Sequence, residues 1–494
     1  MMKKTYLNLN SCKNIFLIFA MSMITLSMSA QTIGQYTASQ VAELKNDLQA
    51  GKYDVYELTE AADYILTSQI IPAKTSIIRA AEGLPSKPVI KFSNTSNLNM
   101  FRVNDPDVTL TFEGIEFDGR NVLTDGGIVK LYASDTEAIN SKLIINDCYI
   151  HHFTGDYVIR NLRPNFSLEI DKSVISDISG ASTHFIQPFY PQATNSNYTL
   201  TNSTFANFSG GSKIIGTGTA GLTVTFLADH CTFHNSTSTS NLLSPREEWE
   251  DITISNSVFT SITKRYSHAN TTIENSYING FETVPTNATI VNSFEAEPAP
   301  AYADASLLHL GLTNKEDFIT PDGLPAGNTM YYLEDPTAAV SNISDTGFDL
   351  SWEPIDNADS YDVYLYQGET LVSQSTVTEG TTHSFTGLTA KTTYTTHVVA
   401  KSADTFYVES QSPSVEVNTL TTGLSSAELG KEFNLIDKTI YLREKGKLEV
   451  YNLQGAKLIS VNNVSSYNTN LGKGVYVIVI SNKSGITSAK ISIR

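Results

Sequence analysis

The sequence is poor in cysteine, in basic residues and in long apolar runs. Three cysteines in 494 residues exclude a fold that disulfides hold together. Lys and Arg number 33 against 51 Asp and Glu, a formal net charge of −18. This excess of acid argues against a nucleic-acid partner, which requires a basic face for phosphates. Because 40% of the residues are hydrophobic and 10% aromatic, the chain can form cores, and ~150 residues per domain suggests about three domains.

The only long apolar run lies at the start of the chain. Three lysines precede an apolar run over residues 15–26, and small residues follow up to Ala30. A basic segment, a short apolar core and a small-residue cleavage site predict a secretory signal peptide over residues 1–30. A membrane anchor is the alternative, but the run is short for a transmembrane helix. We therefore expect a mature chain without a transmembrane segment.

Residues 110–295 repeat one pattern of strand, small residue and strand. Apolar residues recur three positions before and two positions after the small residue, in the alternation of short strands. Asn or Asp often precedes the small residue, and both tolerate the left-handed backbone of a tight corner. A repeat of this length predicts a solenoid, and the pattern a parallel β-helix whose coils rise ~4.8 Å. The small residues are Cys148, Ser173, Ser203, Cys231, Ser257, Ser276 and Ser293.

The cysteines test this stacking. Cys148 and Cys231 would lie three coils apart, or ~14 Å by the strand spacing. A disulfide requires Cα atoms within about 7 Å. We therefore expect two free and buried thiols.

The pattern also predicts how the solenoid begins. A helix over residues 37–49, with Val41, Leu44 and Leu48 at helical spacing, is expected to cap the first coil, because solenoids require covered ends. Over about residues 35–295 the sequence resembles the pectate-lyase-like right-handed β-helix proteins that Bacteroidetes secrete. This resemblance implies a right-handed β-helix domain over residues 31–300. Residues 301–335 are expected to be a linker or the exit segment of the β-helix.

Alternating strand patterns return after the linker. Trp352, Tyr361, Leu388 and Tyr394 match the fibronectin type III pattern, so residues 336–421 are expected to form a β-sandwich. By that resemblance Trp352 and Tyr394 are core residues. The domain is then a spacer or an adhesion module.

The last residues, 422–494, resemble the C-terminal sorting domain of the Bacteroidetes type IX secretion system. The resemblance implies that the secretion machinery recognises residues 448–494, and that the protein passes through the periplasm to be secreted or held at the outer-membrane cell surface. A second adhesion-like domain is the alternative. The expected fold is all-β: a right-handed parallel β-helix followed by two small β-sandwich domains. The matching residues are Tyr451, Asn452, Gly455, Leu471, Gly474, Tyr476, Gly485, Lys490 and Arg494.

The motifs of known β-helix enzymes are absent from the sequence. The paired carboxylates of polygalacturonase-like hydrolases and the Arg-x-Pro-x-x-Arg run of pectate lyases do not occur. Asp105 and Asp107 form an Asp-Pro-Asp sequence typical of a structural turn. His151 and His152 lack the spaced partners of a zinc site, so we predict a solvated corner and no metal site.

The strands between the repeats carry cations and aromatic residues. Stacking would align Tyr157, His184, Lys213 and Asn241 in one column, and Arg160, Gln187, Gly216 and Ser244 in another. Cations with aromatic rings suit an acidic sugar chain. Ordinary solvated residues of a solenoid surface are the alternative. The predicted ligand-binding residues are Tyr157, Arg160, Arg163, His184, Gln187, Tyr190, Lys213, Arg246 and Trp249.

Three functions remain open from the sequence. The first is binding of an acidic polysaccharide, pectin-like or another uronate glycan, without catalysis. The second is a divergent calcium-dependent polysaccharide lyase, with Arg160, Lys213 or Arg246 as the base; calcium enters only in this case. The third is a surface adhesin with a protein partner. We expect a monomer in each case.

Overall fold

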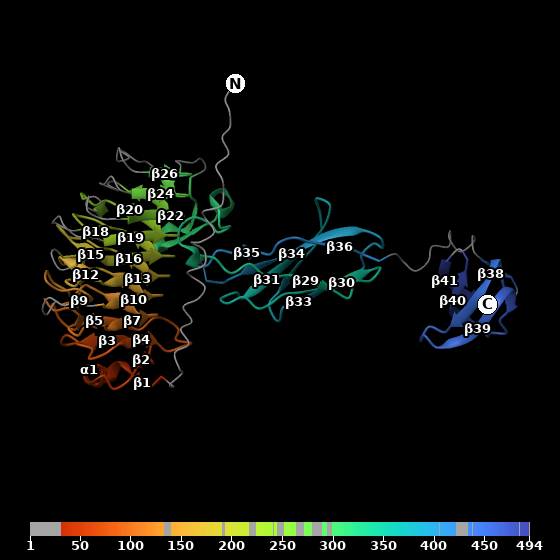
Figure 1. The fold of residues 1–494 in the computed structure, drawn as a ribbon, viewed down its shortest axis with the longest axis horizontal. Coiled ribbons are helices and arrows are strands. Elements are labelled where there is room, and N and C mark those ends of the chain that lie inside the picture. Colours follow the sequence, from red (N-terminus) through yellow and green to blue (C-terminus); the bar gives the residue numbers. More distant parts are fainter. Residues whose placement is uncertain are drawn as a thin grey trace, which may run out of the picture. The chain divides into compact units, whose positions relative to one another are not determined.

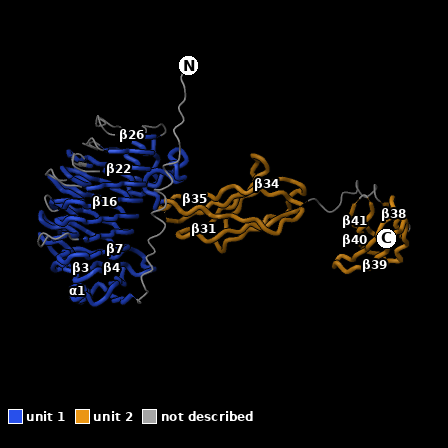
Figure 2. The backbone as a smooth tube through the Cα atoms, viewed as in Figure 1, with its two compact units in different colours: residues 1–331 blue, residues 332–494 orange. Residues whose placement is uncertain are grey.

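The chain forms two compact units, residues 1–331 and residues 332–494 (Figure 2). They are described from a computed structural model. The described residues are 31–132, 140–189, 193–216, 224–240, 242–244, 251–262, 271–278, 289–293, 299–404, 406–420, 433–436, 438–483 and 485–493. The predicted signal peptide lies outside them.

Three long parallel sheets run along the first unit, and neighbouring strands of each sheet come from successive coils (Figure 1). Among the described residues, sheet A has eleven strands, sheet B nine and sheet C six. Sheet A contains β1 (Ile33–Tyr36), β2 (Val55–Leu58), β4 (Ser76–Ala80), β7 (Thr109–Glu113), β10 (Lys142–Asn146), β13 (Ser167–Asp171), β16 (Ser196–Thr201), β19 (Val224–Asp229), β22 (Asp251–Ser255), β24 (Thr271–Glu274) and β26 (Thr289–Val291).

From β2 to β24, each coil continues from sheet A into sheet B and, in the middle of the unit, into sheet C. Sheet B contains β3 (Asp63–Leu66), β5 (Val89–Phe92), β8 (Glu116–Asp118), β11 (Tyr149–His151), β14 (Val174–Ser176), β17 (Thr204–Ala206), β20 (Thr232–Ser236), β23 (Val258–Ile262) and β25 (Tyr277–Ile278). Sheet C contains β6 (Phe101–Val103), β9 (Val129–Leu131), β12 (Tyr157–Asn161), β15 (His184–Pro188), β18 (Lys213–Gly216) and β21 (Leu243–Ser244). This arrangement confirms the predicted parallel β-helix.

The predicted apolar residues form vertical columns inside the coils. On sheet A, Ile145 pairs with Ile170, and Ile170 with Leu200. On sheet B, the rings of Phe205 and Phe233 stack with centroids 5.5 Å apart. The rings of Phe233 and Phe259 stack at 4.4 Å. The apolar positions predicted from the repeat therefore form one continuous core, in which every coil packs on the next.

The small residue of the repeat has a hydrogen-bonding role. Ser257 Oγ accepts the backbone N–H of Cys231, one coil earlier, at 3.1 Å and donates to the carbonyl of Ser255 at 2.7 Å. Ser276 and Ser293 repeat the contact, because each accepts the N–H of the preceding anchor residue at 3.1 Å. A serine at this position thus pairs a backbone donor that the corner between sheets A and B would leave buried without a partner.

Replacing Ser257 with alanine is expected to lower the free energy of unfolding by about 1–3 kcal/mol, because the buried N–H of Cys231 loses its acceptor. The exposed Ser93→Ala variant serves as the control and should change stability by no more than about 0.5 kcal/mol. Denaturant unfolding measures both variants. Equal stability of Ser257→Ala and the wild type would show that the hydrogen bond from Cys231 N–H to Ser257 Oγ does not stabilise the β-helix.

The residue before the small residue has the left-handed backbone that the sequence predicts. Asn202, Asn256, Asn275 and Asn292 have φ between 43° and 49°, and Asp147 has φ 51°. The Asn292 amide also donates to Asn275 Oδ1 of the preceding coil at 3.3 Å. Asparagine therefore both turns the corner and links neighbouring coils.

Both described cysteines are buried and free, as predicted. Cys148 Sγ lies 3.3 Å from the carbonyl oxygen of Asn146, and Cys231 Sγ lies 3.5 Å from that of Asp229. Burial raises the pKa of both thiols, to about 12 for Cys148. At neutral pH both groups are protonated and act as small core residues.

The N-terminal end of the β-helix carries a short helical segment, η2 (Ala38–Gln40) followed by α1 (Val41–Ala50). The Gln40 side chain accepts the backbone N–H of Thr37 at 2.9 Å. Leu44 and Leu48 are buried against the first coil. The helix ends at Gly51, whose φ of 60° suits glycine at this position.

The segment after the last coil packs back on the outer face of sheet B. Tyr331 Oη lies 2.8 Å from Thr204 Oγ1, and the Asn328 backbone donates to Thr232 Oγ1 at 2.9 Å. These contacts make residues 299–331 part of the β-helix unit. The segment contains β27 (Tyr302–Asp304), η3 (Ala305–Leu307), β28 (His309–Leu312), η4 (Lys315–Phe318) and η5 (Thr329–Tyr331).

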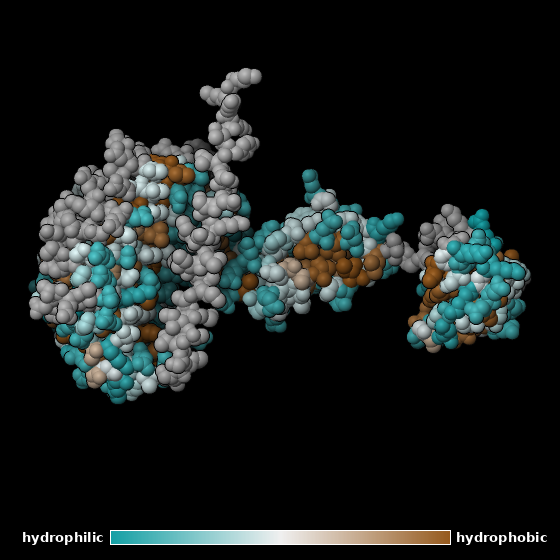
Figure 3. Space-filling view, viewed as in Figure 1, coloured by the Kyte–Doolittle hydropathy of each residue, from teal (hydrophilic) through white to brown (hydrophobic). Residues whose placement is uncertain are grey.

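The second unit begins with a β-sandwich whose buried residues include Trp352 and Tyr394. The Thr389 N–H donates to Tyr394 Oη at 3.0 Å, a contact typical of immunoglobulin-like sandwiches. Apolar residues form a visible patch over this domain (Figure 3). One sheet contains β29 (Ala339–Ser341), β30 (Gly347–Ser351) and β33 (Thr382–Thr386). The other contains β31 (Ser360–Gln367), β32 (Thr370–Val377), β34 (Thr393–Lys401), β35 (Ser410–Gln411) and β36 (Val415–Asn418).

The C-terminal residues form an antiparallel sheet with its own core, to which Leu448, Val450, Ile478 and Ile480 contribute. Its strands are β37 (Phe433–Ile436), β38 (Thr439–Tyr451), β39 (Lys457–Asn468), β40 (Gly474–Asn482) and β41 (Gly485–Ile493). The described part of the chain contains no helix that is long and apolar enough to cross a membrane.

Candidate ligand-binding face

Sheet C carries a column of cations on its outer side. Arg102 pairs with Lys130, Lys130 with Arg160, and Arg160 with Gln187. Successive members lie on neighbouring strands, ~4.8 Å apart. In the same column the next pair, Gly216 and Ser244, is uncharged. The column therefore places three positive charges side by side along the solenoid axis of an acidic protein.

Aromatic rings border these cations. The Arg102 guanidinium lies 4.0 Å from the ring centroid of Tyr132, and that of Arg160 lies 4.5 Å from the ring of Phe189. Tyr132 is 42% exposed and Phe189 39%, so both rings present apolar area to solvent. We call Arg102, Lys130, Arg160, Gln187, Tyr132 and Phe189 the cationic face.

One carboxylate holds part of the column in place. Asp125 Oδ1 lies 3.2 Å from Arg160 Nη1 and 3.6 Å from Lys130 Nζ. The Asp125 side chain is 61% exposed, whereas those of Lys130 and Arg160 are only 15% and 17% exposed. An exposed carboxylate in contact with two partly buried cations is a counter-ion that an external acid group can replace.

Two polar atoms of the cationic face have no partner among the described residues. Arg160 Nε and Gln187 Oε1 are both buried and make no hydrogen bond there. An unpaired buried donor or acceptor costs about 1–3 kcal/mol. A ligand that offers acceptors to Arg160 and a hydroxyl to Gln187 would satisfy both atoms.

The second predicted column aligns as expected but is largely buried. Tyr157 pairs with His184, and His184 with Lys213. Tyr157 has no exposed surface and donates from Oη to the carbonyl of Asp125 at 2.9 Å. His184 is 7% exposed. Contrary to the sequence-based prediction, Tyr157 and His184 are therefore not exposed ligand-contacting residues. The Tyr157 ring instead lies under the Arg160 guanidinium, 4.8 Å from it.

Burial also fixes the charge of His184. Desolvation, followed by repulsion from Lys213, lowers its pKa to about 4. The folded protein therefore disfavours the protonated imidazole, whereas the unfolded chain accepts a proton near pH 6.5. The stability from a neutral His184 is present above pH 6.5 and is lost as the pH falls toward 4.

Replacing His184 with glutamine is expected to reduce the loss of unfolding free energy between pH 7 and pH 4 by about 3 kcal/mol, because each pKa unit corresponds to about 1.4 kcal/mol. Denaturant unfolding at a series of pH values measures this difference. A pH profile of His184→Gln parallel to that of the wild type would contradict the assignment.

Arg163 is not a surface residue, contrary to the sequence-based expectation. It has no exposed surface. Its guanidinium donates to the carbonyls of Val103 at 3.0 Å, Asp105 at 2.7 Å and Tyr132 at 2.8 Å. Burial lowers its pKa to about 10. Arg163 joins the ends of three sheet C strands and cannot contact a ligand. The carbonyl contact also gives the turn at Asp105 a structural role, as predicted.

The remaining predicted residues divide into two groups. Lys213 is half-buried at the start of β18. Tyr190, Arg246 and Trp249 lie outside the described residues. The sequence-based prediction omitted Arg102 and Lys130, although Phe-Arg at 101–102, Val-Lys at 129–130 and Ile-Arg at 159–160 all place the cation directly after an apolar strand residue.

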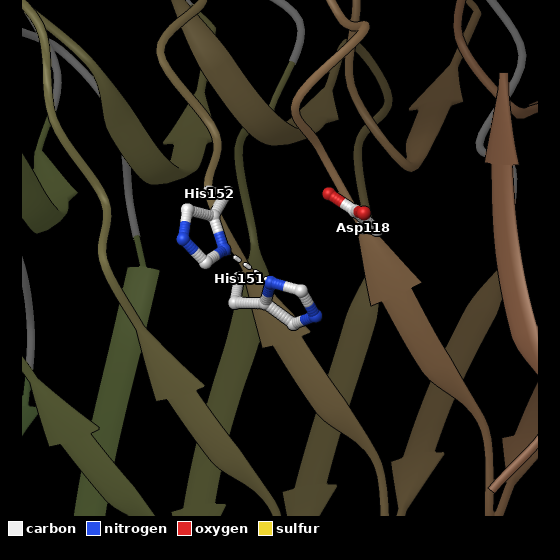
Figure 4. Close-up of side chains that lie close together, drawn as sticks. All are labelled: Asp118, His151 and His152. Carbon is white, nitrogen blue, oxygen red and sulfur yellow. Dashed lines mark hydrogen bonds between the residues drawn. The ribbon is translucent and has the colours of Figure 1, made fainter.

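A second cluster lies on sheet B, where the side chains of His151 and His152 meet beside Asp118 from the preceding coil (Figure 4). His151 is 3% exposed, so the predicted solvated corner is wrong for this residue. Burial, followed by repulsion from His151, lowers the pKa of His152. A groove of about 380 Å³ lies beside His152, and Arg120 and Asp177 contribute to its wall.

Comparison with known proteins identifies one part of the chain. The model of the family "Fibronectin type III domain" matches residues 335–416, which confirms the expected domain. No curated protein is significantly similar to the chain. A computationally redesigned β-sandwich protein is 23% identical, over 18% of this chain and 97% of that one, with a TM-score of 0.16. A two-domain fibronectin type III segment of chicken tenascin is 16% identical, over 32% of this chain and all of that one, also with a TM-score of 0.16.

Proposed function

We propose that the protein binds an acidic polysaccharide, a pectin-like or other uronate glycan, along the cationic face and without catalysis. The observation that supports this most directly is the column of Arg102, Lys130 and Arg160 on successive coils. A linear glycan with a carboxylate on each sugar offers repeated anions to such a column. Charge-assisted hydrogen bonds then supply affinity.

The aromatic residues favour a sugar over a simple polyanion. Tyr132 and Phe189 are exposed beside the two arginines. Aromatic rings bury apolar area in preferred stacking geometries, and the C–H face of a pyranose provides such area. Because the net charge of the whole chain is −18, a polyanion is attracted only where the charge is locally reversed.

The arrangement favours binding over lyase chemistry. A calcium-dependent lyase requires several oxygen ligands around the metal. The ion pairs of the described residues place Asp125 alone at the cationic face, against Lys130 and Arg160. Of the three candidate bases, Arg160 is held by this carboxylate, Lys213 is half-buried, and Arg246 lies outside the described residues. No specific observation favours catalysis or an adhesin.

A panel of glycans tests the proposal. The full-length protein is expected to bind polygalacturonate and alginate, to bind their carboxyl-reduced forms much more weakly, and to lose affinity as salt rises, because screening weakens exposed charge pairs. Isothermal titration calorimetry measures affinity, and absorbance of unsaturated products measures cleavage. Equal affinity for the neutral forms would contradict the role of charge, and turnover would contradict binding without catalysis.

We propose further that residues 1–30 direct export and that the type IX secretion machinery recognises residues 448–494, so that the protein is secreted or held at the outer-membrane cell surface. The separate core of the C-terminal sheet supports this, since residues 433–493, which include nearly all of that segment, form a core of their own. A chain lacking residues 448–494, expressed in a Bacteroidetes host, should accumulate in the periplasm. Unchanged export of this chain would contradict the sorting role.

A further inference from the structure

The two adjacent histidines share one side of the chain because of the local backbone. Successive side chains of a strand normally point to opposite faces. His151 ends β11 on the outer side of sheet B, and His152 follows with a φ of 61°. This left-handed residue turns the chain, so that the Nδ1 atoms of both rings face each other at hydrogen-bond contact (Figure 4).

The contacts around His151 orient its lone pair. His151 Nε2 lies 2.9 Å from Glu116 Oε1 on the preceding coil. Because an ionised carboxylate only accepts hydrogen bonds, Nε2 carries the proton of the neutral ring, and this tautomer has its lone pair on Nδ1. A histidine whose far nitrogen donates to a carboxylate has the arrangement common among metal ligands.

A carboxylate completes the set from the neighbouring strand. Asp118, His151 and His152 each provide a ligand atom, and these atoms all lie within 4.8 Å of one another. Asp118 is 5% exposed, and Arg120 holds it in place through contacts of 3.0 Å to each oxygen. The side chain of His152 borders the groove, so a fourth position can face solvent.

We propose that Asp118, His151 and His152 bind a divalent transition metal ion, with Zn²⁺ the best match, and that Glu116 orients His151 from outside the ligand set. Two imidazoles and one carboxylate, with a fourth position open to the groove, form a common zinc ligand set. The nitrogen ligands exclude a good calcium site, since Ca²⁺ takes oxygen ligands. Two nitrogens on a tetrahedral zinc lie roughly 3.3 Å apart, given Zn–N bonds of about 2.0–2.1 Å. The Nδ1 atoms of His151 and His152 are now at hydrogen-bond contact, which is closer. The half-buried His152 ring therefore turns slightly toward the groove when the ion binds.

The repeat provides matched variants. Asn207 and Asn235 occupy the corner position of His152 in later coils and share its left-handed backbone, so His152→Asn removes a ligand while retaining the corner. His234 lies in the same outward column of sheet B as His151. Asn235 follows His234 where His152 follows His151, and His234 bonds to Thr260 at 2.8 Å. His234→Gln is therefore the control.

Zn²⁺ binding to the untagged full-length protein tests the site. Calorimetry and metal analysis after dialysis are expected to find one ion per chain, with affinity at least tenfold lower in His152→Asn and Asp118→Asn and unchanged in His234→Gln. Glu116→Gln should weaken binding about 10- to 100-fold. Co²⁺ should give the visible absorption of a tetrahedral site. Absence of Zn²⁺ binding by the wild type, or unchanged affinity in His152→Asn, would overturn the proposal.

Discussion

Replacing Arg163 with alanine is expected to lower the free energy of unfolding of the β-helix by about 3–5 kcal/mol. The guanidinium donates to the carbonyls of Val103, Asp105 and Tyr132 and to Ser141 Oγ, with distances from 2.7 to 3.0 Å. Removing it leaves buried acceptors unpaired, each at about 1–3 kcal/mol, and opens a cavity that the neighbouring coils cannot fill.

Two further variants separate these causes. Arg163→Met fills most of the volume without donors, so it should recover the packing part of the loss. Arg163→Lys keeps the charge, but its single ammonium group cannot bond to all the acceptors that the planar guanidinium of Arg163 reaches. Denaturant unfolding measures all three variants. A loss below about 1 kcal/mol in Arg163→Ala would contradict the structural role and reopen Arg163 as a binding residue.

Replacing Arg160 with alanine is expected to lower affinity for polygalacturonate about 10- to 100-fold, because a charge-assisted hydrogen bond contributes about 1.5–3 kcal/mol. Arg160 occupies the middle of the cationic face, between Lys130 and Gln187, and its Nε has no partner among the described residues. Among the described residues its side chain makes one ion pair, to the exposed Asp125. Stability should therefore change little.

Asp125→Asn should act in the opposite direction. Neutralising the counter-ion frees Lys130 and Arg160 for the ligand, so affinity should rise severalfold. Lys142→Ala is the matched control, because Lys142 pairs with Glu169 at 2.7 Å on sheet A, away from the column. Calorimetry with the full-length variants measures affinity. Equal losses in Arg160→Ala and Lys142→Ala would indicate a general effect of charge, and unchanged affinity in Arg160→Ala would remove this face from the site.

The features of the β-helix that could be predicted from the sequence are those that follow from its repeat. Once Ser203, Cys231 and Ser257 are aligned, the columns of Phe205, Phe233 and Phe259 follow, because equivalent residues of stacked coils must pair. The corner asparagines follow from the same alignment. The fibronectin type III sandwich was likewise visible from Trp352 and Tyr394, because those residues mark its core.

The sequence could not predict contacts that join unlike parts of different coils. Arg163 resembles Arg160 in its surroundings, but its partners are backbone carbonyls 31 to 60 residues earlier in the chain. Because backbone acceptors have no sequence signature, the burial of Arg163 could not be predicted from the sequence. Asp118 meets His151 only because β8 and β11 stack. The early copies of the repeat are degenerate, and this hid the place of Arg102 and Lys130 in the column.

A crystal structure of the protein with a bound oligogalacturonate would show whether the cationic face is the glycan-binding site. We expect the glycan to lie along sheet C, with carboxylates on Arg102, Lys130 and Arg160 and with Asp125 displaced from Arg160. The sugar rings should lie against Tyr132 and Phe189. A glycan bound to another surface, such as the groove beside His152, with the contacts between Asp125 and Arg160 intact, would contradict it.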